Sequence, residues 1–232
     1  GGHEVLLQSL SRVTLKSLDI TMLAADMGIQ EIPTAHPDAC RFLPQQLGQQ
    51  KHDLVICDGQ VLRTHQRQAY RDRREARRLT VTQLALGLEH LREGGNMIVL
   101  LHRIEQWESF YLLYTFDQFS TVKVFKPRTA HTKRSSFYLV ASDVQSKDHR
   151  ALSAVTRWKT IWRVATFGTD EEYAQSLRLG NVDVATTICE FGETLATLGE
   201  EIWDIQAHAL ERAPFNRGVH TERRVNKGAV VM

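Results

Sequence analysis

The sequence predicts an α/β fold with a mostly parallel sheet flanked by helices, because strand and helix patterns alternate from residue 5 to residue 141. Two apolar runs, at 54–57 and 96–101, are long enough for strands buried on both faces and too short for helices. Between them, leucines recur at helical spacing, which predicts a helix with one core-facing side. Strand, helix and strand in this order are typical of a parallel pair joined by a crossover helix.

The other elements follow in order along the chain. An alternating pattern predicts a strand at 13–20, and three prolines predict a long connection over 30–50. A strand at 53–58 ends in the turn signal Asp58-Gly59, and a helix at 63–93 ends at Gly94-Gly95, because glycine accepts the left-handed cap conformation. The sheet region is completed by a strand at 96–101, an aromatic-rich helix at 107–119, a strand at 122–125, a basic loop at 126–136 and a strand at 137–141. No helix separates the last two strands, so we expect an antiparallel hairpin at one edge.

Three parts are expected in the domain organisation. Residues 1–145 form the sheet domain, 146–214 form a helical extension with helices at 151–163 and 170–212, and 215–232 lack periodicity and are expected to be a disordered tail. The first residues, Gly1-Gly2-His3-Glu4, resemble neither a signal peptide nor a natural start, so we expect a cut chain.

Composition excludes some classes of protein and leaves others open. The chain has 232 residues, of which 42% are hydrophobic, and a formal net charge of +2, which neither requires nor excludes a polyanionic partner. No run of about 18 apolar residues occurs, so no membrane span is expected. The three cysteines lie far apart, as reduced thiols of an intracellular (cytoplasmic or nuclear) protein do. The ten histidines form no His-x-x-x-His pair with matching acidic ligands, so no metal site is expected.

Asp58 is the first candidate functional residue. It follows a buried strand directly, and open α/β sheets bind ligands at the carboxyl ends of their strands. The alternative is that Asp58-Gly59 only turns the chain.

Arginines recur at three- and four-residue spacing in the helix that follows, which places them along one stripe. The stripe consists of Arg63, Arg67, Arg71, Arg74 and Arg78. Lys126 and Arg134, in the basic loop, are expected on the same rim. Because guanidinium groups match phosphate oxygens, this rim predicts RNA binding. The alternative is a solvated charged helix, partly neutralised by its own acidic residues.

The order and spacing of several motifs resemble the FtsJ-like RNA 2′-O-methyltransferases, and within them the cap-type and fungal FtsJ-domain sequences. The motifs are Asp58-Gly59, Gly94-Gly95-Asn96-Met97-Ile98-Val99, Phe125-Lys126-Pro127 and Ser135-Ser136-Phe137-Tyr138-Leu139-Val140. The similarity covers about residues 1–141 and implies a Rossmann-like S-adenosylmethionine methyltransferase fold with an antiparallel last strand. The resemblance also implies that this fold is incomplete at the amino end, because the family's glycine-rich cofactor loop would precede Gly1.

The resemblance implies S-adenosylmethionine as cofactor, with Asp19 and Ile20 against the adenine and Asp58 at the cofactor. A cap on the next helix is the alternative role of Asp19. The family's catalytic set is Lys-Asp-Lys-Glu, and Asp58 matches its aspartate. Leu100 stands at the position of the second lysine and Ser136 at that of the glutamate.

A leucine cannot replace an ammonium group, so another residue would have to assist Asp58. His102 shares a strand face with Leu100, and a histidine can act as a base near neutral pH. The function expected by resemblance is therefore methylation of RNA ribose by an S-adenosylmethionine-dependent enzyme. The alternatives are a catalytically lapsed fold that binds RNA or protein, and a methyltransferase with another acceptor.

Overall fold

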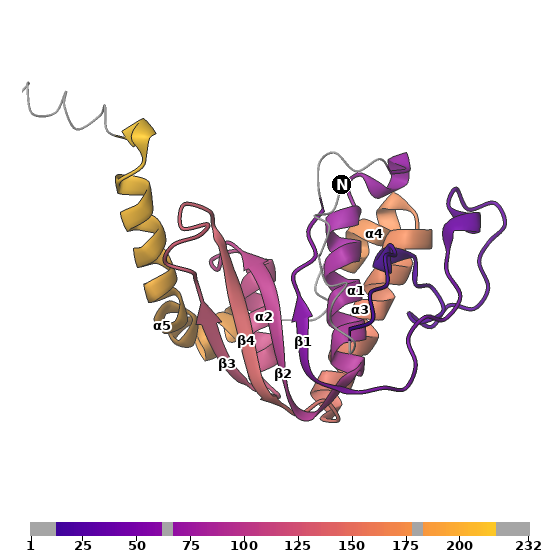
Figure 1. The fold of residues 1–232 in the computed structure, drawn as a ribbon, viewed down its shortest axis with the longest axis horizontal. Helices are drawn as coiled ribbons and strands as arrows, with labels where there is room; N and C mark the ends of the chain where they lie inside the picture. Colours follow the sequence, from indigo (N-terminus) through magenta and orange to yellow (C-terminus); the bar gives the residue numbers. More distant parts are fainter. Residues whose placement is uncertain (1–12, 62–66, 178–182, 217–232) are drawn as a thin grey trace, which may run out of the picture.

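The computed structural model describes residues 13–61, 67–177 and 183–216, and Figure 1 shows their arrangement. The strands are β1 (His52–Cys57), β2 (Leu91–His102), β3 (Thr121–Phe125) and β4 (Ser136–Val144). The α-helices are α1 (Glu75–Glu89), α2 (Trp107–Asp117), α3 (His149–Phe167), α4 (Asp170–Leu177) and α5 (Val184–Glu211). Short 3-10 helices are η1 (Ile20–Met22), η2 (Ala39–Arg41), η3 (Ala69–Arg71) and η4 (Pro214–Asn216). The predicted α/β architecture is confirmed.

In the described residues the four strands form one sheet in the order β1-β2-β4-β3. β1 pairs with β2 in parallel, across the crossover helix α1 that the sequence predicts. β4 is antiparallel to both β2 and β3, so the antiparallel hairpin at one edge is confirmed and the described sheet is mixed. The carboxyl ends of β1 and β2 therefore lie side by side.

One face of the sheet carries the hydrophobic core. Alternate residues of β2 and β4 are buried, and they share one core with side chains of α1, α2 and α3. Gly87 permits close contact between α1 and the sheet, because an added Cβ would lie 2.9 Å from Met97 Cε and 3.0 Å from Val55 Cγ1. Trp158 and Trp162 of α3 belong to this same core.

The opposite face is open in the part of the chain that the structure describes. Leu54 and Ile56 of β1 are 50% and 60% exposed, and Phe125 of β3 is 56% exposed. The prediction that the 54–57 strand is buried on both faces is therefore wrong for these residues. Its apolar composition predicts burial, but β1 lies at one edge of the described sheet and only Val55 and Cys57 turn toward the helices.

Three local predictions differ from the structure. No strand forms over the described 13–20; Asp19 instead caps η1 by accepting a hydrogen bond from Thr21 N. Helix α1 is shorter than the predicted 63–93, because residues 69–74 form η3 and a turn. Gly94-Gly95 lies inside β2 and does not end the helix, since the chain leaves α1 at His90 and Leu91 already pairs with His52.

Candidate functional site

The loop after β1 is fixed by a side chain of α1. Gly59 N donates to Gln83 Oε1 (2.7 Å), and Gln83 Nε2 donates to Gly59 O (3.1 Å). A Cβ at Gly59 would lie 2.9 Å from Gln83 Oε1, so glycine permits this close contact. The two hydrogen bonds hold the backbone beside Asp58, whose own side chain is exposed.

Asp58 lies next to an aromatic hydroxyl on β4. In the sheet register Cys57 pairs with Val99, and Leu100 pairs with Tyr138. Burial raises the pKa of Tyr138, and the nearby negative charge of Asp58 raises that pKa further. The Leu100 position thus offers Asp58 no ammonium group, and Tyr138 is the polar side chain across from it.

His102 ends β2 and contacts the same loop. Its Nε2 donates to Gln60 Oε1 (3.1 Å), because an amide oxygen can only accept. With Nε2 protonated, Nδ1 of the neutral ring is left as an acceptor. Burial lowers the pKa of His102 below 6.5, and the charges of Arg134 and Lys126 lower it further. The ring is therefore neutral at pH 7 and can accept a proton.

A cavity of about 560 Å³ connects the η1 segment with the loop after β1. Asp19 and Ile20 line one side of it, and Gly59 and Gln60 line the other. Two segments far apart in sequence thus border one cavity. Of the candidate residues, Asp19 and Ile20 line it, whereas Asp58 and His102 are not among its lining residues. Its volume lies in the range of about 300–1,000 Å³ that is usual for small-molecule sites.

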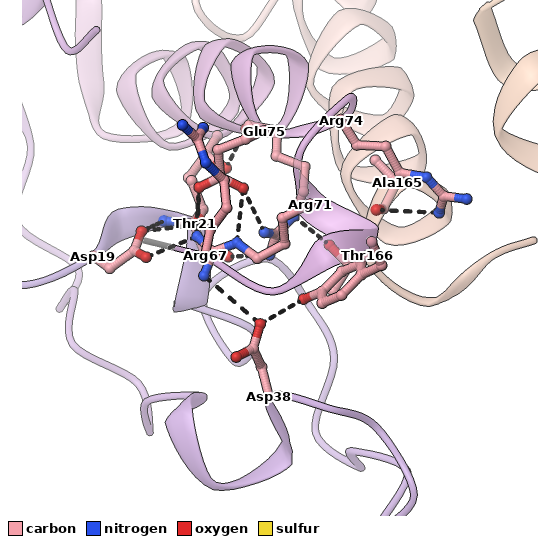
Figure 2. Close-up of polar contacts among 12 residues, drawn as sticks. Asp19, Thr21, Asp38, Arg67, Arg71, Arg74, Glu75, Ala165 and Thr166 are labelled. Atoms are coloured by element: carbon pink, nitrogen blue, oxygen red, sulfur yellow. Dashed lines mark hydrogen bonds and ion pairs between the residues drawn. The ribbon is translucent and has the colours of Figure 1, made fainter. Parts of the chain in front are cut away.

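The Asp19 carboxylate is partly occupied by neighbours within the protein (Figure 2). Its Oδ1 accepts from Thr21 N (3.0 Å) and Thr21 Oγ1 (2.7 Å), and its Oδ2 accepts from Arg71 Nη2 (2.9 Å). Burial acts to raise the pKa of Asp19, but the hydrogen bonds from Arg71 and Thr21 outweigh it and the pKa is lowered. Its side chain remains 40% exposed. The capping alternative from the sequence is confirmed, and the remaining exposed part faces the cavity.

The predicted stripe of solvent-facing arginines is wrong for three of its members. Arg71, Arg74 and Arg78 are 2%, 6% and 0% exposed. Arg71 lies between Asp19, Asp38 and Glu75, as Figure 2 shows, and pairs with all three.

Arg78 and Arg74 are paired within the protein as well. Arg78 donates to Glu75 Oε2 (2.9 Å), Thr166 Oγ1 (3.0 Å) and Thr21 O (3.0 Å). Arg74 pairs with Asp170 and donates to Gly168 O (2.8 Å). These guanidinium groups bind carboxylates and carbonyls of the protein, so they are not available to RNA phosphates.

The other predicted RNA-binding residues differ in accessibility. Lys126 is 3% exposed and donates to Arg134 O and to Ser136 O (2.8 Å), so it fixes the basic loop to β4 and is not exposed to RNA. Arg134 is exposed, and Arg67 is partly buried beside Asp72 (3.4 Å). Arg63 lies outside the described residues.

Sequence reasoning missed Gln83, Gln60 and Tyr138. Glutamines carry no distinctive pattern, and Gln83 lies in the middle of a helix whose leucines dominate the signal. Tyr138 follows Ser136 in an aromatic strand, and the alternation of that strand already predicts that it turns away from buried Phe137.

Two classes of site are not found in the part of the chain covered by 13–61, 67–177 and 183–216. No group of three or more histidine, cysteine, aspartate or glutamate residues there is arranged to hold a metal ion. None of the described helices is both long and apolar enough to cross a membrane.

Comparison with known proteins agrees with the fold. A search of curated proteins found no significant match to the chain. The family model of the FtsJ-like methyltransferases matches residues 2–144, which include all four strands and the loop after β1. The chain belongs to the FtsJ-like methyltransferase family.

Proposed function

We propose that the chain transfers a methyl group from S-adenosylmethionine to the 2′-hydroxyl of an RNA ribose. The observation that carries this proposal is the 560 Å³ cavity, because it joins Asp19 and Ile20 to the loop that follows Asp58. Cofactor and acceptor must meet at one point for direct transfer, and the carboxyl end of β1 is where open α/β sheets bind ligands.

The residues of the cavity fit the cofactor. The exposed part of the Asp19 carboxylate can accept a hydrogen bond from the adenine amine, and Ile20 offers an apolar surface to the ring. When bound, S-adenosylmethionine supplies a methyl group on a sulfonium centre. Gly59 and Gln60, on the opposite wall, bring the Asp58 loop to that position.

The protein's own residues then activate the acceptor. A ribose hydroxyl is a weak nucleophile, so a base must accept its proton as the oxygen–carbon bond forms and the carbon–sulfur bond breaks. His102 is neutral at pH 7 with Nδ1 as acceptor, and is the proposed base. The role proposed for Asp58 is to orient the ribose by accepting a hydrogen bond from it. RNA would approach over Arg134, which is exposed beside His102.

A labelled-methyl transfer assay with RNA tests the role of Asp58. Asp58→Asn should reduce the transfer rate by about 100-fold or more, which is the usual contribution of a positioned acid–base group. The matched control is Asp53→Asn, at the other end of β1, where the carboxylate is exposed and pairs with Arg92 (2.7 Å). A rate for Asp58→Asn equal to that of the control would overturn the proposed role.

Measurements of RNA affinity test whether Arg134 contacts the RNA. Arg134→Gln should weaken binding of RNA of any sequence and reduce the slope of log affinity against log salt by about one. Unchanged affinity and unchanged salt slope would remove Arg134 from the interface.

A second candidate function is RNA binding by a fold that no longer catalyses transfer. It is favoured by Leu100, which provides no ammonium group opposite Tyr138. Wild-type protein that binds RNA and cofactor but transfers no label would establish this alternative.

A further inference from the structure

A second cavity, of about 260 Å³, lies between α1, α2 and α3 on the other side of the loop after β1. Its deep walls are the buried side chains of Leu84, Leu112 and Trp158. Its mouth is bordered by exposed residues, among them Gln60 and Glu108, so the cavity opens to solvent.

Two arginines line this cavity, Arg77 from α1 and Arg157 from α3. In each, the Nε is buried and has no hydrogen-bond partner among residues 13–61, 67–177 and 183–216. Across the described residues, neither guanidinium lies within ion-pairing distance (4.0 Å) of a carboxylate. Arg157 Nη1 donates a hydrogen bond to the Tyr111 hydroxyl (2.7 Å).

This arrangement is unfavourable without a ligand. A buried N–H group that lacks an acceptor destabilises a fold, and two nearby positive charges repel each other. Burial lowers the pKa of Arg77, and the charge of Arg157 contributes to that lowering. A dianion bound by the two guanidiniums would balance both charges and remove the repulsion.

The remaining walls indicate the rest of the ligand. Trp107 and Tyr111 line the cavity, and aromatic side chains stack on flat rings. The Arg157 guanidinium already stacks over Tyr111, with its Cζ 4.4 Å from the ring centroid. The Glu108 carboxylate at the mouth can accept hydrogen bonds from hydroxyl or amine groups, and its negative charge acts on Arg77 in the opposite direction to the charge of Arg157.

We propose that this cavity binds a 5′-nucleoside monophosphate, with its phosphate between Arg77 and Arg157, its base against Trp107 and Tyr111, and its polar edge at Glu108. The phosphate supplies the missing dianion, and the base and ribose supply the flat and hydroxyl-bearing groups. This cavity shares Gly59, Gln60, Val61 and Leu79 with the cavity lined by Asp19 and Ile20, and His102 also lines it. Arg77, Arg157, Trp107 and Tyr111 line this cavity and not the other, so binding of a nucleotide here can be measured without methyl transfer.

Isothermal titration of the full chain with AMP, adenosine, inorganic phosphate and the dinucleotide ApA tests the proposal, without S-adenosylmethionine present. AMP should bind at least about 10-fold more tightly than adenosine or phosphate, because only AMP provides both the dianion and the ring. ApA carries a diester with a single charge, and should bind more weakly than AMP. Tighter binding of ApA, or equal binding of adenosine, would overturn a monophosphate site.

Substitutions locate the site. Arg77→Gln and Arg157→Gln should each weaken AMP binding by about 10-fold or more, which corresponds to one hydrogen bond between charged groups. The matched controls are Arg73→Gln in the turn before α1 and Arg163→Gln on α3, both exposed and outside this cavity, and they should leave the affinity unchanged.

A third variant keeps both arginines, so a loss of binding in it cannot result from the loss of an arginine that the fold needs. Thr80→Phe fills the cavity from α1 and should abolish AMP binding. AMP binding that persists in Thr80→Phe, or that is lost equally in the two control variants, would contradict the assignment.

Discussion

Arg77 and Arg78 are neighbours on α1, yet they lie in opposite chemical environments. Arg78 is fully buried and donates three hydrogen bonds, to Glu75, Thr166 and Thr21. Arg77 is partly buried, and its Nε has no partner. Successive residues on a helix point about 100° apart, so one side chain enters a network of carboxylates while the other enters a cavity. A row of arginines along a helix therefore indicates neither RNA binding nor stabilisation of the fold by itself. The role of each arginine depends on the groups that its guanidinium contacts.

The largest change in stability is expected when the ion pairs of the buried arginines are removed. Glu75→Gln removes the charge that Arg71 and Arg78 share and leaves two buried guanidiniums undercompensated. It should lower the free energy of unfolding by about 3 kcal/mol, measured by urea denaturation.

The matched control is Glu89→Gln at the other end of α1, where the carboxylate pairs with Lys159 (2.7 Å) and both side chains remain partly exposed. This change should cost less than about 1 kcal/mol. Equal costs for the two substitutions would show that the buried network is not a principal source of stability.

Substitution of Arg77, whose Nε is buried without a partner in the described residues, should increase stability. Arg77→Met keeps an apolar stem in the cavity wall and removes the unpartnered N–H groups, so it should raise the free energy of unfolding by about 1 kcal/mol. Arg73→Met, at an exposed position of the preceding turn, should change it by less than about 0.5 kcal/mol. A loss of stability in Arg77→Met would mean that Arg77 has a stabilising partner.

A smaller effect concerns Asp19 and pH. The pKa of Asp19 is lowered in the folded state, so its ionised form contributes stability above pH 3.8 that is lost as the pH falls through the lower, folded value. A carbon-13 NMR titration should give a midpoint below 3.8. Thr21→Val removes the Thr21 hydroxyl donor at 2.7 Å and should move that midpoint upward. A wild-type midpoint above 3.8 would contradict the pairing with Arg71.

The sequence predicts the order of the elements well because local patterns determine it. Each element is indicated by residues within it or next to it. These are the apolar runs at β1 and β2, the leucines of α1 and the link without a helix between β3 and β4. The antiparallel hairpin follows from the lack of a helix between the last two predicted strands, and is present.

Properties that depend on distant residues were not predictable in this way. The burial of Arg71 depends on Asp19 and Asp38, which lie 52 and 33 positions earlier in the chain. The open face of β1 depends on what else packs there, and an apolar run carries no information about its neighbours. The loop clamp by Gln83 likewise forms between residues 24 positions apart.

The identity of the methylated atom decides whether the chain modifies RNA at the ribose 2′-hydroxyl. RNA incubated with the protein and labelled S-adenosylmethionine is digested to nucleosides, which are separated and identified by mass spectrometry. We expect the label to appear in 2′-O-methylnucleosides, to be lost in Asp58→Asn and to be retained in Asp53→Asn. Label on a base, or on no nucleoside at all while cofactor and RNA both bind, would contradict the proposed function.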